Sequence, residues 1–317
     1  MILSQSERLV AEHKTMSILS TFYFYLAVIN LSTKMNRSFK LLLAFGALFI
    51  LSVTYSTVSA QSAKHKTFHV IAFYHEYNDL AHISFVHDAN KFFPEMAKKY
   101  NFTYDSTKDW SKLNAEELSK YQVVLFLDSR TEDPAQRKAF ETYMKNGGGW
   151  LGFHFAAFAL TPSEYNADWD WFHNEFLGSG QYVSNTWHPT PAILRVEDHK
   201  HPVTKDMPET FKTSPNEWYR WEKDLRKNPD IKILCSIDST SFPLGNGPKQ
   251  SEIWHSGYYP VVWTNKNYKM VYFNMGHNSM DYDGHTNATL SHTFDSPMEA
   301  KLILNALIWA GTGNKVD

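Results

Sequence analysis

Short apolar runs that fit buried strands alternate with segments of helical apolar spacing over the first half of the sequence. Residues 68–74 (FHVIAFY) predict a buried strand, and apolar side chains recur at helical intervals over residues 80–100. The expected elements that follow are an edge strand at 102–106, a short helix at 115–120, a strand at 121–127, a helix at 133–145 and a strand at 150–153. Because strands that alternate with helices usually pair in parallel, this order predicts a parallel sheet covered by helices.

The second half of the sequence has shorter apolar runs separated by polar loops. The β-like runs are residues 192–196, 231–237, 261–264 and 270–275, and a helix is expected at 297–310. The sequence shows no internal repeat or low-complexity segment that would mark a boundary. We therefore predict a single α/β domain with a mostly parallel open sheet, flanked by helices in three layers.

The N-terminal region carries the pattern of a secretory signal peptide. Arg37 and Lys40 precede an apolar run at residues 41–53, and Val58-Ser59-Ala60 supplies a cleavage pattern. An apolar run of this length is short for a helix that crosses a hydrocarbon core of about 30 Å. Residues 35–60 are therefore expected to be a cleaved signal, and the mature protein is expected to be periplasmic or secreted.

The position of Met35 indicates that translation starts there and that residues 1–34 are a mis-called extension of the reading frame. The alternative is that Met1 is the true start. In that case the apolar residues 21–31 and the signal-like run would form a hairpin or an uncleaved anchor.

The charge and the cysteine content narrow the classes of partner. The formal net charge is -2, so the chain has no broad electrostatic attraction to nucleic acid or anionic lipid. The one cysteine, Cys235, lies in an apolar run, which excludes an intramolecular disulfide and a thiolate metal cluster. We expect a small molecule or another protein as the partner, and a homo-oligomer is left open.

Three histidines come at the ends of predicted strands. His75 follows the first strand, His154 lies in the run GGGWLGFHFAA at residues 147–157, and His277 follows the strand at 270–275. Open α/β sheets place their ligands at the carboxyl ends of the strands, so these side chains are expected at one edge of the sheet. The alternative for each is a histidine that caps a turn or packs in a loop.

Glu217 is a fourth candidate, in the sequence Asn216-Glu217-Trp218-Tyr219. A carboxylate beside aromatic and hydroxyl groups suits a sugar, and Glu217 fits a general base or a metal ligand. The alternative is a surface loop in which Glu217 pairs with Arg220. If Glu217 and the three histidines converge, they suit either proton exchange or a divalent metal such as zinc, although no HExxH pair favours the metal. The candidate metal ligands are His75, His154, Glu217 and His277.

Five short motifs follow one another along the sequence: GGGWLGFHFAA, HPVTKDMP, NEWY, PVVW and MVYFNMGH. Together they resemble the trehalose-utilisation (ThuA-like) family. The resemblance covers about residues 66–311, nearly all of the expected mature chain, and sets a ThuA-like domain at 66–312. It implies a fold like that of class I glutamine amidotransferases and a role in the use of trehalose, related glucosides or their 3-keto derivatives.

The amidotransferases place a nucleophilic cysteine at a strand-to-helix turn, where this chain has Gly152-Phe153-His154. Glutamine hydrolysis by a thiolate is therefore not expected. The family placement favours an enzyme that acts on a sugar by proton transfer, as a hydrolase, lyase or isomerase, with His154 and Glu217 as catalytic residues. The expected substrate-binding residues are His75, Tyr219, Trp263 and His277.

Two other functions are open for the same scaffold. The first is a non-catalytic carbohydrate-binding or accessory protein, and the second is a structural partner in an exported sugar-processing complex. Two segments depart from the family pattern, because residues 265–269 lack an expected glycine and residues 77–87 are idiosyncratic. The second departure leaves one edge of the expected site undefined.

Overall fold

The computed structural model describes residues 67–76, 79–159, 169–186, 189–241, 257–278 and 290–313. All of them belong to one compact unit, His65–Asp317. The expected extension at 1–34 and the expected signal peptide at 35–60 lie outside the described residues. Within the described ranges, no helix is both long enough and apolar enough to span a bilayer.

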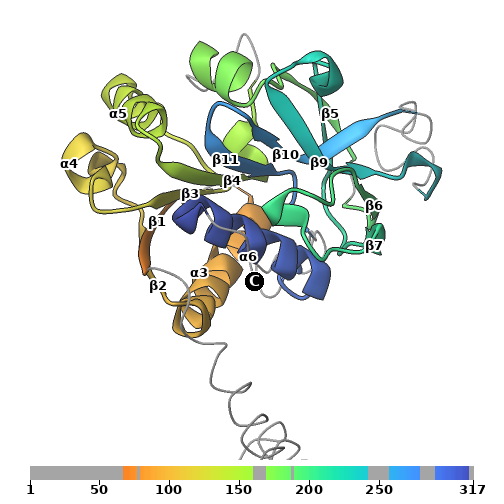
Figure 1. Cartoon of the computed structure of the whole chain (residues 1–317), viewed down its shortest axis with the longest axis horizontal. Coiled ribbons are helices and arrows are strands. Elements are labelled where there is room, and N and C mark those ends of the chain that lie inside the picture. Colours follow the sequence, from red (N-terminus) through yellow and green to blue (C-terminus); the bar gives the residue numbers. More distant parts are fainter. Residues whose placement is uncertain are drawn as a thin grey trace, which may run out of the picture. The chain divides into compact units, whose positions relative to one another are not determined.

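A sheet of nine strands forms the centre of the described structure (Figure 1). In spatial order the strands are β2 (Phe102–Thr107), β1 (Phe68–Tyr74), β3 (Val123–Leu127), β4 (Gly149–Phe153), β11 (Lys269–Phe273), β10 (Tyr259–Asn265), β9 (Ile231–Ile237), β6 (Ile193–Val196) and β7 (Thr210–Lys212). A separate small sheet pairs β5 (Tyr182–Asn185) with β8 (Tyr219–Trp221) in antiparallel fashion.

The predicted α/β fold class is confirmed. Strands β2, β1, β3, β4 and β11 pair in parallel, as the alternating pattern of the first half requires. Beyond β11 the sheet continues as antiparallel pairs through β10, β9, β6 and β7. The sheet is therefore mixed, with its parallel half built mainly from the first half of the sequence.

Helices cover both faces of the parallel half. They are α3 (Leu80–Tyr100), α4 (Ala115–Leu118), α5 (Pro134–Lys145) and α6 (Pro297–Thr312). Figure 1 shows α3 and α6 on one side of the sheet and α4 and α5 on the other. This arrangement gives the three layers that the sequence predicts.

Each face of the sheet has its own hydrophobic core. On one face Phe93 of α3 and Leu307 of α6 are fully buried among strand side chains such as Leu125. On the other face Phe140 of α5 and Trp150 of β4 are fully buried in a second cluster. Complete burial of one large apolar side chain contributes about 1.5–3 kcal/mol, so these layers hold the strands in register.

The register brings the carboxyl ends of four parallel strands to one edge. Tyr74 at the end of β1 is level with Leu127 at the end of β3, and Phe273 of β11 is level with Phe153 of β4. The residues that follow these strands therefore gather at the same edge of the sheet. In parallel α/β sheets this edge is the usual place for a ligand.

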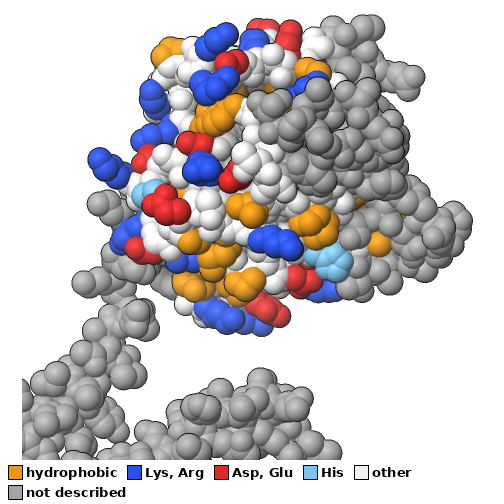
Figure 2. Space-filling model, turned by 90° about the vertical axis from the view of Figure 1, so that its right-hand side faces the viewer, with side chains coloured by type: hydrophobic (Ala, Val, Ile, Leu, Met, Phe, Trp, Pro, Cys, Tyr) orange, Lys and Arg blue, Asp and Glu red, His pale blue; other side chains and the backbone are white. Residues whose placement is uncertain are grey.

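The surface carries charges of both signs. In the view of Figure 2, lysine and arginine side chains are interspersed with acidic ones over the described part of the face. Among the described residues the large exposed hydrophobic side chains are Leu80, Tyr100 and Val183. Mixed charge of this kind agrees with the formal net charge of -2.

Asp133 fixes the start of α5. Its carboxylate accepts hydrogen bonds from the backbone N–H groups of Ala135 and Gln136, and Pro134 occupies the first turn. Because the cap satisfies two otherwise unpaired N–H groups, Asp133→Ala should lower the free energy of unfolding by about 1 kcal/mol. Denaturant titration measures the loss, and Asp133→Ser, which keeps a capping oxygen, should retain most of the stability. Equal stability of the alanine variant and the wild type would contradict this role.

Candidate functional site

His154 lies where β4 ends and the chain turns into the 3₁₀ helix η3 (His154–Ala157). Its backbone φ is 40°, a value uncommon for a residue other than glycine, and the Tyr272 hydroxyl donates to its carbonyl oxygen at 2.9 Å. The imidazole is completely buried. Its Nδ1 lies 3.1 Å from the carbonyl oxygen of Asn274, and its Nε2 lies 3.2 Å from Oε2 of Glu217. The end of the strand thus directs the ring inward, with an acceptor at each nitrogen.

Glu217 lies just before β8 and is only 4% exposed. Its backbone N–H donates to the carbonyl oxygen of His277 at 2.8 Å, and Asn185 donates to its Oε1 at 2.5 Å. Burial acts to raise the pKa of Glu217, but the hydrogen bond with His154 and the positive charge of nearby imidazoles hold this pKa below its usual value. Glu217 is therefore an ionised carboxylate with a partner on each oxygen.

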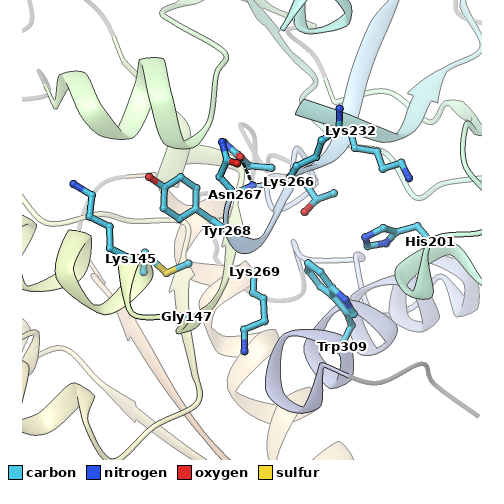
Figure 3. Close-up of a pocket in the computed structure, with 12 residues that line it drawn as sticks. Lys145, Gly147, His201, Lys232, Lys266, Asn267, Tyr268, Lys269 and Trp309 are labelled. Carbon is cyan, nitrogen blue, oxygen red and sulfur yellow. Dashed lines mark hydrogen bonds between the residues drawn. The ribbon is translucent and has the colours of Figure 1, made fainter. Parts of the chain in front are cut away.

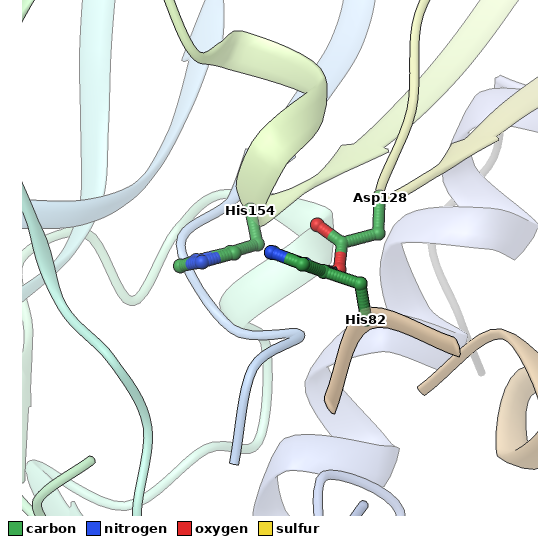
Figure 4. A group of neighbouring side chains, drawn as sticks. All are labelled: His82, Asp128 and His154. Carbon is green, nitrogen blue, oxygen red and sulfur yellow. Dashed lines mark hydrogen bonds and ion pairs between the residues drawn. The ribbon is translucent and has the colours of Figure 1, made fainter. Parts of the chain in front are cut away.

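His82 and Asp128 form a second pair, which the sequence reasoning did not select. His82 lies in the first turn of α3 and Asp128 follows β3; Nδ1 of His82 contacts Oδ2 of Asp128. The backbone N–H of Phe155 donates to the other carboxylate oxygen at 2.7 Å. Figure 4 shows that His82, Asp128 and His154 converge from three separate elements.

The His82–Asp128 pair is strongly coupled. The side chain of Asp128 is completely buried, and that of His82 is 17% exposed. Burial acts to raise the pKa of Asp128, but the adjacent His82 holds this pKa below its usual value. Burial acts to lower the pKa of His82, but the charge of Asp128 raises it above its usual value. In the absence of another cation, the two groups form an imidazolium–carboxylate ion pair.

His277 and Asp79 complete the cluster. The ring of His277 has its centroid 4.8 Å from that of His82 and 5.6 Å from that of His154. Its Nε2 lies 3.7 Å from Oδ1 of Asp79, the residue that caps α3 by accepting from the Ala81 N–H at 2.8 Å. Burial acts to raise the pKa of Asp79, but its bonds to His277 and Ala81 lower this pKa to about 2. Nδ1 of His277 is buried and has no hydrogen-bond partner among the described residues.

The structure brings four of the six predicted site residues together. His154 contacts Glu217, and the backbone of Glu217 contacts that of His277. The ring of Tyr219 packs on His154 with 3.9 Å between the centroids. Burial raises the pKa of the Tyr219 hydroxyl well above its usual value, so this residue enters the site as a neutral phenol.

The other two predicted residues lie apart from this group. His75 is half-buried, and its ring stacks on Trp110 at 5.1 Å between centroids. Burial lowers the pKa of His75 to about 4, so its imidazole is neutral near pH 7. Trp263 is completely buried, and its indole N–H donates to the carbonyl oxygen of Leu177 at 2.9 Å. Trp263 therefore offers no exposed face to a sugar.

Asp128 and His82 were not predicted as site residues, and the sequence gives a signal for the first of them only. Asp128 directly follows a predicted strand, so the strand-end rule that selected His75 applies equally to it. His82 lies inside a predicted helix, where nothing in the spacing separates it from other polar positions. The idiosyncratic segment 77–87 did mark this edge of the site, because it contains both Asp79 and His82.

A pocket of about 390 Å³ opens beside the cluster. Its described lining is His75, Asp79, His82, Val86, Asp128, Ser129, Arg130, Glu132, Phe155 and Phe158. His82 and Asp128 thus contribute to its wall, while His154 and Glu217 are almost entirely buried. A volume of this order suits a small ligand, and the lining offers both polar groups and aromatic faces.

A buried network of amides holds the segments that carry Glu217 and His277. Asn216 donates to Oε1 of Glu299 at 3.1 Å, and Asn278 donates to Oδ1 of Asn216 at 2.9 Å. The other oxygen of Glu299 accepts from the backbone N–H of Ser214 at 2.6 Å. Burial raises the pKa of Glu299 to about 7. Helix α6, which contains Glu299, is in this way tied to the two residues next to the cluster.

Gly276 allows close approach of its loop to His154. Its φ is 146°, and a Cβ atom at this position would lie 2.9 Å from Cβ of His154. Gly276→Ala should therefore lower the free energy of unfolding by about 1–3 kcal/mol and displace the His154 ring. Denaturant titration checks the stability, and Gly147→Ala is the control, because Gly147 has a φ of 87° but open space around its Cβ position. Equal losses in both variants would show that contact with His154 is unimportant.

A second pocket, of about 410 Å³, lies at the opposite edge of the sheet, by the start of β11 (Figure 3). Four lysines are part of its lining: Lys145, Lys232, Lys266 and Lys269. None of the described lining residues is acidic, so the charge of this pocket disfavours a cation. Groups suited to proton exchange or metal binding thus gather at the first pocket.

Similarity to known proteins extends over most of the chain. The model of the ThuA family, described as trehalose utilisation, matches residues 70–310. A putative ThuA-like protein from Bacteroides uniformis has 36% sequence identity and a TM-score of 0.68, and the match covers 80% of this chain and 94% of that one. A putative ThuA-like protein from Parabacteroides merdae has 20% identity and a TM-score of 0.52, over 80% and 92% of the two chains. No curated protein matches the chain.

Proposed function

The chain belongs to the ThuA, or trehalose-utilisation, family, and from this premise we propose that it is an enzyme that acts on a glucoside or a 3-keto-sugar by proton transfer. The proposal assigns proton exchange to His154 and Glu217. It assigns contact with the substrate to His82 and Asp128, which line the pocket.

The observation that carries the proposal is the His154–Glu217 pair. Nε2 of His154 and Oε2 of Glu217 are 3.2 Å apart and almost completely buried beside a pocket of about 390 Å³. A carboxylate and an imidazole in contact can pass a proton between them, and such groups contribute typically 10²–10⁴-fold to a rate. Three carboxylates and three imidazoles gather in this one cluster.

The chemistry of the proposed substrates fits these groups. A ketone on the sugar ring acidifies the neighbouring C–H bond, so a base that removes this proton and a donor that stabilises the resulting oxyanion are sufficient for elimination or isomerisation. Glu217 is ionised and fits the final proton acceptor behind the pocket wall, in contact with His154, while His82 has its pKa raised by Asp128, lines the pocket and fits the donor. Hydrolysis of a glucoside would use the same acid to protonate the glycosidic oxygen and the same base to activate a water for attack on the anomeric carbon.

A glutaminase activity is not part of the proposal. Cys235 is completely buried in β9, and burial raises the pKa of its thiol far above the usual value. The turn at the end of β4 carries His154 in place of a nucleophile. A buried neutral thiol does not act as a nucleophile.

Proton NMR with the purified chain tests the proposal. Trehalose, other glucosides and their 3-keto derivatives are incubated in turn with the wild type, and the sugar signals are followed over time. Appearance of a new sugar product supports an enzyme. Broadening of the sugar signals without any product in every case would refute the enzyme and favour a carbohydrate-binding or accessory protein.

We propose also that the protein is exported, on the basis of the signal-like pattern at residues 35–60. N-terminal sequencing of the protein recovered from the cell envelope or medium tests this. A mature N-terminus close to Gln61 supports export with cleavage, and an intact N-terminus in the cytoplasmic fraction would refute it.

A further inference from the structure

We propose that His82, Asp128 and His154 bind a divalent first-row transition-metal ion such as zinc. The ion would lie at the wall of the first pocket, which His82 and Asp128 line. A ring nitrogen of each histidine and an oxygen of the carboxylate all lie within 4.8 Å of one another. Figure 4 shows the three side chains meeting from α3 and from the ends of β3 and β4. Catalytic zinc sites take three ligands of these types from the protein. The binding stands on this geometry alone, and only the ion's role in catalysis rests on the function proposed above.

The surroundings of His154 favour a cation. A neutral imidazole has one N–H, yet both nitrogens of His154 face an oxygen acceptor, the Asn274 carbonyl at 3.1 Å and the Glu217 carboxylate at 3.2 Å. Burial lowers the pKa of His154, which favours the neutral ring. One nitrogen of a neutral ring must then direct its lone pair at an oxygen. A metal ion bound at that nitrogen replaces this repulsion with an attraction to both groups.

The contacts behind the three ligands are those of a metal site. The Asn274 carbonyl accepts from Nδ1 of His154, which leaves the Nε2 lone pair for an ion. The Phe155 N–H holds Oδ1 of Asp128 at 2.7 Å and leaves Oδ2 toward His82. Such outer contacts fix the tautomer of a histidine ligand and the orientation of a carboxylate ligand.

His277 supplies an independent observation. Its side chain is only 2% exposed, and its Nδ1 has no hydrogen-bond partner in the part of the chain that the structure describes. Its ring lies 4.8 Å from the ring of His82. A buried polar atom without a partner is costly, and an ion or a water bound to the ion would provide one.

The donor set and the pocket define the kind of ion. Two imidazole nitrogens with one carboxylate oxygen suit zinc, iron or manganese better than magnesium or calcium, which prefer oxygen ligands. Because His82 and Asp128 reach the pocket wall, the ion would keep an open position toward a ligand there. With a sugar in the pocket, that position suits a carbonyl or hydroxyl oxygen, which the ion would polarise in place of the donor role given above to His82, while Glu217 would keep the role of base.

Cobalt(II) is the probe for the test, because its visible absorption reports nitrogen and oxygen ligation directly. The full chain is stripped with a chelator, dialysed and titrated with Co²⁺, and bound zinc is measured separately by elemental analysis. The wild type should bind one ion per chain. His82→Ala and Asp128→Asn should bind about 10²-fold more weakly, because the first removes a ligand and the second replaces a charged ligand oxygen by a neutral amide. His75→Ala, from the same pocket, and His201→Ala, from the second pocket, should bind as the wild type does.

Circular dichroism and thermal melting show which variants are folded, and Asp128→Asn, which preserves the shape of the side chain, decides the matter if His82→Ala does not fold. Failure of the wild type to bind Co²⁺ or zinc would overturn the inference, as would wild-type affinity in both cluster variants. Metal binding without turnover of any sugar would uphold the site and refute the proposed function. Full turnover of a sugar by a protein that binds no metal would refute the metal site and uphold the proposed function.

Discussion

Replacing Glu217 by glutamine should lower kcat on the sugar that the protein turns over by a factor of about 10²–10⁴. The amide has the shape of the carboxylate but cannot accept a proton, so the His154–Glu217 pair loses its base. Asn185 and His154 keep a hydrogen-bonding partner in the variant, which limits the disturbance of the site. Steady-state kinetics over a range of sugar concentrations separates this loss from any change in KM.

Glu209→Gln is the matched control for this experiment. The side chain of Glu209 is 86% exposed and lies next to the edge strand β7, so its replacement should leave kcat unchanged. Thermal melting of both variants establishes that they are folded. Wild-type kcat in a folded Glu217→Gln protein would remove Glu217 from the mechanism.

The stability of the protein should carry a pH dependence that Glu299→Gln removes. The pKa of Glu299 is raised from 4.5 to about 7 by burial, so the folded state binds its proton more tightly than the unfolded state. A group of this kind stabilises the fold fully below pH 4.5 and loses that contribution as the pH rises through 7. A rise of this size in the pKa corresponds to about 3 kcal/mol of stability.

The measurement is the free energy of unfolding of the wild type and the variant, by denaturant titration, between pH 5 and pH 8. Asp128 and Glu217 change the stability in the opposite direction at low pH, because their pKa values are lowered in the fold. The informative quantity is therefore the difference in the free energy of unfolding between the two proteins. As the pH rises, the stability of Glu299→Gln relative to the wild type should increase by up to about 3 kcal/mol. Glu141→Gln serves as the control on α5. A difference that does not change with pH would mean that Glu299 is not a buried titrating group.

The sequence predicts the parallel half of the fold because each of its strands is a short apolar run followed by a helical pattern. A strand such as β3, with five buried residues, has no other stable place than the interior of a sheet. The antiparallel half is different. The runs that form β6, β9 and β10 were all expected as strands, but their order and direction depend on pairings across the sheet that local patterns do not specify.

The site was predictable to the extent that its residues follow strands. His154 and Asp128 both come directly after parallel strands, and the register of β3 with β4 brings them to the same edge. The position of Glu217 beside His154 depends on the small β5–β8 sheet and on its backbone bond to His277. The position of His82 likewise depends on tertiary structure, because His82 reaches the cluster only where α3 starts at this edge of the sheet with Asp79 as its cap.

The family description and the structure support each other at this edge. The family is described by the use of trehalose, which is a carbohydrate, and the cluster contains imidazoles and carboxylates, the types of group to which the proposals assign proton exchange and metal binding. The second pocket, with its lysines, has one such group, His201, and no carboxylate among its described lining. The proposed chemistry therefore belongs to the carboxyl ends of β3 and β4.

Proton transfer to and from a sugar is the centre of this account, and hydrogen exchange with solvent tests it most directly. A 3-keto-glucoside is incubated with the wild type in D₂O, and the signal of the C–H group beside the ketone is followed by proton NMR. The account predicts that this signal disappears faster with the wild type than in buffer, and that Glu217→Gln abolishes the acceleration. An undiminished signal and an unchanged sugar in the presence of the folded wild type would contradict it.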